Sequence, residues 1–80
     1  MWGPSRDQVQ VLEAAREPRL MSELLEVCGR TSRTKFRDQV VRPLLEAGLL
    51  EMTIPDKPRS SKQRYRTTDA GARLVGEGEG

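Results

Sequence analysis

The sequence predicts an α+β fold in which helices fill the first half of the chain and a β-hairpin follows them. Apolar residues recur at helical spacing as far as Ala47, whereas from Leu50 onward they alternate with polar residues, as in strands. A short helix, Gly29 and a longer helix with a basic start make a helix-turn-helix pattern. A hairpin with a long loop behind such a pair is typical of a winged helix-turn-helix, with three helices, a two- to three-stranded antiparallel hairpin sheet and a short C-terminal helix.

The first expected helix covers residues 6–16. Ser5 can accept a backbone N–H at its start, and Gln8 three residues later completes a capping box. Before Pro18 ends the helix, a narrow apolar stripe consists of Val9, Leu12 and Ala15. Residues 19–21 are too few for an independent strand, but they can add a short third strand to a sheet that the hairpin forms.

A second, short helix is expected to be capped by Ser22 and to end at Gly29, which suits the left-handed conformation that often closes a helix. Leu24, Leu25 and Cys28 are expected inward or on its flank. We interpret Cys28 as a small buried hydrophobe, because nothing near it in the sequence marks the thiol as activated.

The third expected helix starts in the basic segment 29–42, GRTSRTKFRDQVVR. Thr31 and Ser32 are good N-cap residues, since a side-chain oxygen can accept an unpaired backbone N–H there. The inward stripe that follows consists of Phe36, Val40, Leu44 and Ala47, with Val41 and Leu45 widening it. Pro43 removes one backbone hydrogen bond, and we expect a kink near Gln39.

After Gly48 ends that helix, the hairpin is expected. Its inward residues are Leu50, Met52 and Ile54 in one strand and Tyr65 and Thr67 in the other. The intervening loop, residues 55–63, is too long for a tight turn, and its tip is basic and rich in hydroxyl groups.

A final short helix is expected over residues 69–75. Thr67 or Thr68 can cap it, and Asp69 lies favourably at the positive end of its dipole. Its Leu74 and Val75 are expected to close the bottom of the core.

The length of 80 residues suits one small domain with a modest core. We place this domain at residues 5–75, between a disordered leading segment (1–4) and a disordered polar tail (76–80). The sequence contains neither a run of about 18 apolar residues, as a membrane span needs, nor the apolar core of a secretory signal. The expected location is therefore cytoplasmic.

The sequence offers little of the chemistry that an enzyme needs. It has no histidine, which is the commonest general base, and no glycine-rich loop that would cradle a phosphate. With Cys28 as its single cysteine, it can form no internal disulfide and is not expected to hold a metal. We therefore expect a monomer that is not an enzyme and has no cofactor, no metal and no membrane partner.

Positive charge gathers in the middle of the chain although the net charge is only +2. Residues 30–66 carry ten lysines and arginines against four acids, a local charge of +6, while each flanking segment carries −2. If these basic groups share one face, that face has the electrostatic character of a surface that binds polyanions.

The stretch from Phe36 to Gly71 resembles a known family through RPLLEAGLLEMTIPDKP, KQRYR and TTDAG, of which MTIPDKP is the most specific part. It is similar to the C-terminal winged-helix module of two kinds of larger bacterial and archaeal protein. These are transcriptional regulators with an AlbA-type or Schlafen-like ATP-binding domain, often labelled RecG-like, and Fic-domain proteins. The family usually has Leu-Thr where this chain has Thr67 and Thr68, so an apolar core position is replaced.

The resemblance implies a winged-helix fold that either binds DNA or docks against the catalytic domain of its own parent protein. It also implies that neither ATPase activity nor AMP transfer resides in this chain.

The first functional hypothesis is binding of double-stranded DNA by a module of a transcriptional regulator or helicase-related protein. The third helix would lie in the major groove, with Arg33, Lys35 and Asp38 at base edges, while the hairpin loop follows the backbone or enters the minor groove. The complete set of expected contact residues is Thr31, Ser32, Arg33, Thr34, Lys35, Arg37, Asp38, Arg42, Lys57, Arg59, Ser60, Ser61, Lys62 and Arg64.

The alternative hypothesis is a winged helix that docks onto a protein. The same basic groups would then meet an acidic surface of the catalytic domain or of another partner. Leu45, Val41 or Trp2 would supply an apolar anchor of the kind that dominates interface energetics.

Overall fold

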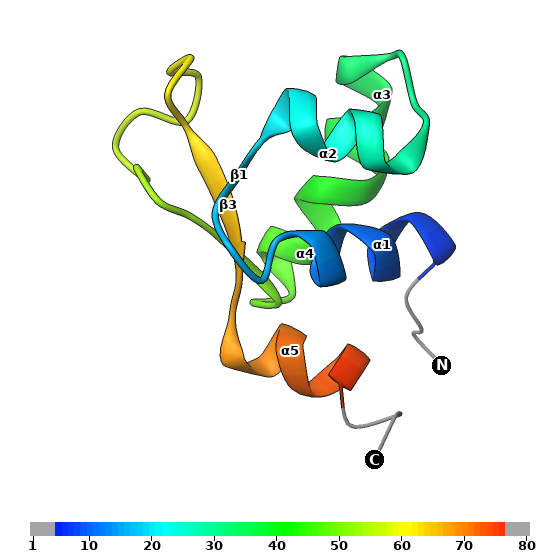
Figure 1. Ribbon diagram of the computed structural model, residues 1–80. Helices are drawn as coiled ribbons and strands as arrows, with labels where there is room; N and C mark the ends of the chain where they lie inside the picture. Colours follow the sequence, from blue (N-terminus) through cyan, green and yellow to red (C-terminus); the bar gives the residue numbers. More distant parts are fainter. Residues whose placement is uncertain (1–4, 77–80) are drawn as a thin grey trace.

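The computed structural model describes residues 5–76 and has the expected α+β architecture (Figure 1). The expectations for Trp2 and for the two chain ends lie largely outside these residues. The elements in chain order are α1 (Arg6–Ala14), β1 (Arg19–Leu20), α2 (Met21–Cys28), α3 (Arg33–Phe36), the π-helical turn η1 (Arg37–Val41), α4 (Arg42–Glu46), β2 (Leu50–Met52), β3 (Arg64–Thr67) and α5 (Asp69–Gly76).

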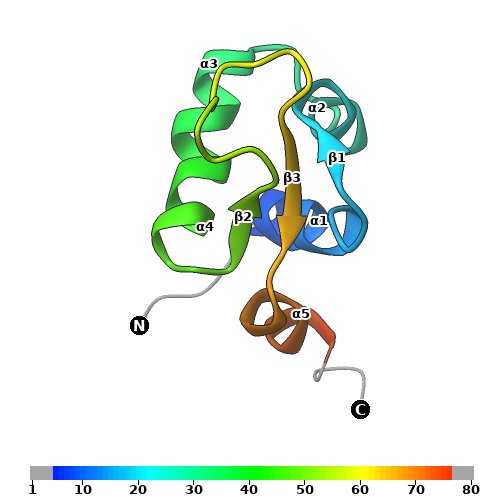
Figure 2. The same ribbon diagram turned by 90° about the vertical axis from the view of Figure 1, so that its left-hand side faces the viewer.

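A three-stranded antiparallel sheet of order β1-β3-β2 stands beside the helices, so β3 is the central strand (Figure 2). Tyr65 in β3 lies opposite Arg19 in β1 and Met52 in β2. The third strand expected from residues 19–21 is therefore present, but Met21 already belongs to α2.

The core lies between the helices and the inner face of this sheet. Its buried hydrophobic residues are Val11, Leu12, Ala15, Met21, Leu24, Phe36, Val40, Val41, Leu44, Leu49, Leu50 and Tyr65. The inward stripe expected for α1 is confirmed at Leu12 and Ala15 but wrong at Val9, which is half-buried, whereas Gln8 and Val11 are buried. Positions 8, 11, 12 and 15 are those that one face of a 3.6-residue helix presents together.

The N-cap predicted from the sequence is correct for α1 and wrong for α2. At α1, the capping box is confirmed, since the Gln8 N–H donates to Ser5 Oγ at 3.3 Å and the Ser5 N–H donates to Gln8 Oε1 at 2.8 Å. The cap expected for α2 at Ser22 was wrong. The chain turns directly from β1 into α2, and Glu23 Oε1 accepts the N–H of Leu20 at 2.8 Å.

Glycine closes the next two turns as expected. Gly29 and Gly48 both have left-handed backbone conformations, with φ of 65° and 74°. At Gly29 the N–H of Arg30 donates to Leu25 O at 2.9 Å, and at Gly48 the N–H of Leu49 donates to Leu44 O at 2.9 Å, as in Schellman closures.

The helix formed by α3, η1 and α4 contains the disturbance expected near Gln39, in the form of a π-helical turn. The N–H of Arg42 donates to Arg37 O five residues earlier, and Pro43 then lies in the first turn of α4, where its missing N–H costs little. Ser32 occupies the N-cap position, but its side chain makes no capping bond. The inward stripe holds for Phe36, Val40 and Leu44 and fails for Ala47, which is exposed because the helix ends there.

Thr67 and Thr68 join the sheet to α1 and α5. The Thr67 hydroxyl donates to Leu12 O at 2.6 Å, so this threonine is buried at the apolar position with its polar group satisfied. Thr68 caps α5, where its Oγ1 accepts the N–H of Gly71 at 3.2 Å. A Cβ on Gly71 would lie 2.2 Å from Leu49 O, so only glycine allows this close packing of α5.

The end of α5 contributes less to the core than the sequence suggested. Val75 packs against the core, but Leu74 is 41% exposed, so its expected role was wrong.

The loop between β2 and β3, residues 53–63, is the wing, and the side chain of Gln63 holds it together. Gln63 is buried, its Oε1 accepts the N–H of Ile54 at 2.9 Å, and its Nε2 donates to Ile54 O and, at 2.9 Å, to Lys57 O. The last backbone hydrogen bond between the two strands runs from the Thr53 N–H to Arg64 O at 2.9 Å, and beyond it the Gln63 amide keeps the loop in a fixed shape.

We expect Gln63→Ala to lower the free energy of unfolding by about 2 kcal/mol, because it removes three hydrogen bonds and leaves the half-buried Ile54 N–H without its partner. Hydrogen exchange should show that the Ile54 amide loses its protection in this variant. The control is Gln39→Ala at an exposed position, which should change the stability by less than about 0.5 kcal/mol. Equal effects of the two substitutions would contradict the role given to Gln63.

Candidate cationic binding face

The start of the long helix and the tip of the wing lie on either side of one groove, which we call the α3–wing groove. It has a volume of about 510 Å³. The residues that line it are Leu20, Met21, Ser22, Arg33, Arg37, Pro58, Arg59, Ser60, Ser61, Gln63 and Tyr65. Five of the residues predicted from the sequence as contacts therefore meet in one place, namely Arg33, Arg37, Arg59, Ser60 and Ser61.

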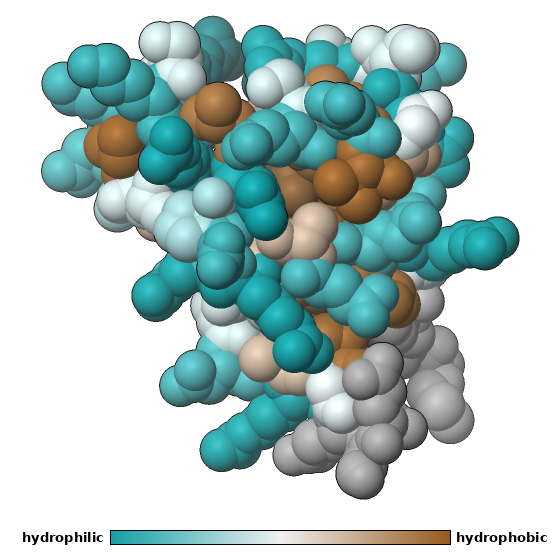
Figure 3. All heavy atoms as spheres, viewed as in Figure 1, coloured by the Kyte–Doolittle hydropathy of each residue, from teal (hydrophilic) through white to brown (hydrophobic). Residues whose placement is uncertain are grey.

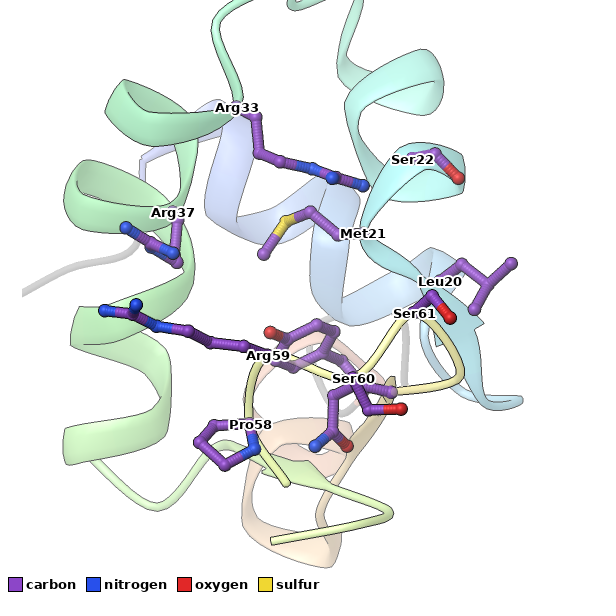
Figure 4. A pocket seen from close by; sticks show the side chains of 11 residues that line it. Leu20, Met21, Ser22, Arg33, Arg37, Pro58, Arg59, Ser60 and Ser61 are labelled. Carbon is purple, nitrogen blue, oxygen red and sulfur yellow. The ribbon is translucent and has the colours of Figure 1, made fainter. Parts of the chain in front are cut away.

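Three arginines dominate this groove. Arg33 and Arg37 lie one helical turn apart, so they share a face of the helix, and Arg59 comes from the wing. Figure 4 shows Arg33 extending from α3 toward Met21 and Ser22, while Arg59 extends from the wing toward the long helix. Arg33 and Arg59 thus extend in opposite directions across the groove and their guanidinium groups end at opposite walls, while the Arg37 guanidinium lies over the long helix.

The remaining predicted contacts do not line this groove. Thr31, Ser32 and Lys35 line a second hollow of about 250 Å³ on another flank of the helix start, together with the Asp7–Arg30 ion pair. The others are exposed outside both hollows; they are Thr34, Asp38 and Arg42 on the long helix and Lys57, Lys62 and Arg64 on or beside the wing.

Ion pairs reduce the charge of the long helix more than that of the wing. Asp38 Oδ1 lies 3.7 Å from Arg37 Nε and 3.9 Å from an Arg42 nitrogen. Within residues 5–76, no salt bridge engages Arg33, Lys35, Lys57, Arg59, Lys62 or Arg64. We call Arg33, Arg37, Lys57, Arg59, Lys62 and Arg64 the cationic face; Lys35 lies on the other flank of the helix start. Arg66, by contrast, pairs with Glu51, its Nε donating to the carboxylate at 2.8 Å.

The sequence did not identify Tyr65 as part of the site. It was expected inward on the second strand, and it is only 5% exposed, yet it also lines the α3–wing groove. Burial raises the pKa of the Tyr65 phenol above its usual value, while the nearby charges of Arg37 and Arg33 lower it. At neutral pH the phenol keeps its proton and can donate a hydrogen bond.

Arg37 also has an unused donor. Its Nε is buried and has no hydrogen-bond partner among the described residues. A buried donor without a partner is costly, and the nearest acidic group to this one is Asp38 Oδ1 at 3.7 Å.

Cys28 lies away from the groove, as its interpretation requires. Burial raises the pKa of its thiol, the Asp7 carboxylate raises it further, and Arg30 lowers it. The thiol donates weakly to Asp7 O at 3.7 Å. A raised pKa keeps the sulfur in its less reactive form.

Among residues 5–76, no group of three or more His, Cys, Asp or Glu side chains is placed to hold a metal ion. In the same part of the chain, no helix has both the length and the apolar character that crossing a membrane requires.

Most of the surface over the wing and sheet is hydrophilic, with apolar residues in separate spots (Figure 3). The fold is that of a small winged-helix-like domain, in which Arg33, Arg37 and Arg59 line one groove. Comparison with known families identifies the domain further. The family described as "Filamentation induced by cAMP protein Fic-like, C-terminal domain" matches residues 7–68, so the chain belongs to this family.

A solved structure supports the assignment. The crystal structure of a Fic family protein from Desulfovibrio desulfuricans G20 is 36% identical to this chain, with a TM-score of 0.67. The match covers 81% of this chain and 21% of that one, so the chain spans about a fifth of the length of this relative. No curated protein matches the chain. The expected resemblance to Fic-domain proteins is thus confirmed, while the resemblance to RecG-like regulators stays a prediction.

We expect the single tyrosine of the chain to titrate above pH 10, the value of a free phenol. Arg37→Gln should raise this pKa further because it removes a neighbouring positive charge, whereas Lys35→Gln on the other flank should leave it unchanged. Tyrosinate absorbance against pH measures both.

The same shift affects stability. A phenol whose pKa is higher in the folded chain stabilises the fold fully below about pH 10, and this stability is lost as the pH rises through the folded value. A tyrosine that titrates at or below pH 10 in the folded protein would contradict the burial of the phenol.

Proposed function

We propose that this domain is a non-catalytic docking module that binds an acidic protein surface through its cationic face. The observation that carries this proposal is the α3–wing groove, which is concave and combines arginine side chains with apolar lining from Met21 and Pro58. Protein surfaces that bind extended segments have this mixture of pocket and charge, since apolar contact supplies affinity and charge complementarity selects the partner.

The placement of Arg33 favours docking over DNA recognition. A base-reading arginine has to project outward into the major groove. Here Arg33 instead extends from α3 toward Met21 and Ser22 of α2 (Figure 4). The outward side of the same helix carries Asp38 at its centre, whose negative charge opposes an approach to phosphates.

In the relative of known structure, the rest of the chain is available as a partner for such a module. In the Desulfovibrio relative the matching part is 21% of a longer chain. If the present domain belongs to a comparably long protein, another part of that protein is the nearest partner. We propose an acidic surface there as the docking site.

The apolar anchors expected from the sequence have to be replaced in this account. Val41 is fully buried in the core, Leu45 is half-buried, and Trp2 lies outside the described residues. Apolar contact would come instead from the groove lining, chiefly Met21 and Pro58. Docking would therefore depend strongly on charge and weaken with salt.

Binding of double-stranded DNA is the second candidate, and one observation favours it. Three cations of the wing region are exposed and make no salt bridge within residues 5–76: Lys57, Lys62 and Arg64. The wing itself lies beside the start of the long helix. Such groups suit phosphate contacts that carry no sequence information.

Amide shifts of the 80-residue chain at 0.15 M salt distinguish the two functions. The probes are a decaglutamate peptide, a decaglutamine peptide as the uncharged control, and a random duplex of similar total charge. We expect decaglutamate to shift residues 33–37 and 58–63 saturably and the duplex to bind more weakly, because an extended peptide can enter the α3–wing groove, whereas a duplex meets only the exposed side chains around it. Tighter binding of the duplex than of decaglutamate would favour the DNA hypothesis and contradict docking.

A further inference from the structure

We propose that the α3–wing groove recognises a short sequence motif of the partner, in which an apolar residue stands between acidic ones. The apolar side chain would lie on the floor of the groove, and the acidic residues before and after it would meet Arg33 and Arg59 at the rim. This inference rests on the proposed docking function and states which side chains the partner must present. Docking by charge alone would be compatible with the proposed function but not with this motif.

The floor of the groove is mainly apolar. Of the residues that line the groove, Met21, Gln63 and Tyr65 are buried, with exposed fractions of 8%, 4% and 5%. A buried residue that still lines a hollow forms its floor. The Gln63 amide is already used by the wing, since its Oε1 accepts from Ile54 and its Nε2 donates to Ile54 O and Lys57 O. The floor therefore offers a ligand the thioether of Met21 and the aromatic side chain of Tyr65, and both favour an apolar group.

Positive charge lies at the rim, on opposite sides of this floor. Arg33 and Arg59 are exposed, and within residues 5–76 neither has a salt-bridge partner. Figure 4 shows that Arg33 extends from the long helix toward Ser22, whereas Arg59 extends from the wing toward the long helix. Two guanidinium groups that end at opposite walls do not share one carboxylate, but they suit two acidic residues on either side of an apolar one.

The size of the groove fits one side chain together with its neighbours. Its volume of about 510 Å³ lies within the range of roughly 300 to 1,000 Å³ that ligand pockets have. Half-buried Leu20 and exposed Pro58 extend the apolar surface from the floor to the rim. An extended segment can therefore keep its backbone at the rim, beside the exposed hydroxyl groups of Ser22 and Ser61, and place one side chain below it. Apolar contact then supplies affinity, and the flanking charges select the segment.

Three heptapeptides, each acetylated and amidated, test the motif in titrations of the 80-residue chain followed by amide shifts. The first has leucine between two blocks of three glutamates, and the second has glutamine in place of the leucine. The third keeps the leucine and has glutamine in place of every glutamate. We expect the first to bind about tenfold more tightly than the second, because leucine leaves water on the floor, and about tenfold more tightly than the third, which lacks the charges. Equal binding of the first two would overturn the motif.

Nuclear Overhauser contacts locate the leucine of the bound first peptide. We expect contacts from its methyl groups to the Met21 methyl group and to the ring protons of Tyr65. Two large apolar side chains outside the groove are more exposed than these, namely Val27 at 49% and Leu74 at 41%. Contacts to either of them in place of Met21 and Tyr65 would overturn the assignment of the floor.

Two exposed prolines of the wing provide a matched pair of variants. Pro55 and Pro58 occupy the same position in consecutive turns, in which the Lys57 N–H donates to Ile54 O and the Ser60 N–H donates to Lys57 O, both at 3.0 Å. Only Pro58 lines the groove. We expect Pro58→Ser to reduce the preference for the leucine peptide over its glutamine counterpart about threefold, because apolar wall is lost. Pro55→Ser, which loosens the loop in the same way, should leave the preference unchanged, and equal effects would contradict an anchor in this groove.

Charge variants test the rim separately from the floor. Arg33→Gln and Arg59→Gln should each weaken both glutamate peptides about threefold and leave the preference for leucine intact. Lys35→Gln removes a charge outside the groove and should weaken them less than about twofold. Equal effects of all three substitutions would overturn the role given to the two rim arginines. These side chains are exposed, so the variants should unfold at the urea concentration of the unmodified chain.

Failure of the motif and failure of docking remain distinguishable. If neither decaglutamate nor the glutamate heptapeptides bind the unmodified chain, the docking function fails together with the motif. If the leucine and glutamine versions of the acidic heptapeptide bind equally, docking by charge stands and the motif is overturned.

Discussion

The central position of β3 is the constraint on which the rest of the structure depends. Because this strand pairs on both sides and side chains alternate along it, residues 63, 65 and 67 all point inward, while Arg64 and Arg66 point outward. The polar group of each inward residue has a different role. The Gln63 amide bonds to the wing backbone, Tyr65 lines the groove together with the arginines, and the Thr67 hydroxyl donates to Leu12 O in α1. One strand therefore fixes the relation between sheet, wing and helices.

The fold could be predicted largely from the sequence because its signals are local. The Ser5–Gln8 capping box, the glycines at 29 and 48, and the alternation around Tyr65 each express a short-range physical preference. The errors arose where tertiary packing decides among local options. Val11 is buried in the core where Val9 was expected. The N-cap of α2 is Leu20 and not Ser22, because the helix begins directly after β1. Leu74, near the end of α5, is exposed.

The binding face was predictable in composition but not in geometry. The basic segments of the sequence predicted Arg33, Arg37 and Arg59 as contact residues, and all three line one groove. No local sequence signal indicated that Arg33 and Arg59 would share that groove. Tyr65 and Gln63 were missed as site residues because their roles depend on how the wing returns over the sheet. A polar residue at an inward strand position, such as Gln63, was the available signal, since a buried amide has to find partners.

The wing is held rigidly beside the long helix by the Gln63 side chain, so that Arg59 and Arg37 line one groove. Nuclear Overhauser contacts in solution between Pro58 or Arg59 and the side chains of Arg37 and Tyr65, measured with backbone order parameters of residues 55–62, test it most directly. The structure predicts such contacts and order parameters near about 0.85, the value of a rigid backbone. Absent contacts with order parameters below about 0.6 would contradict it, because a mobile wing cannot form the groove.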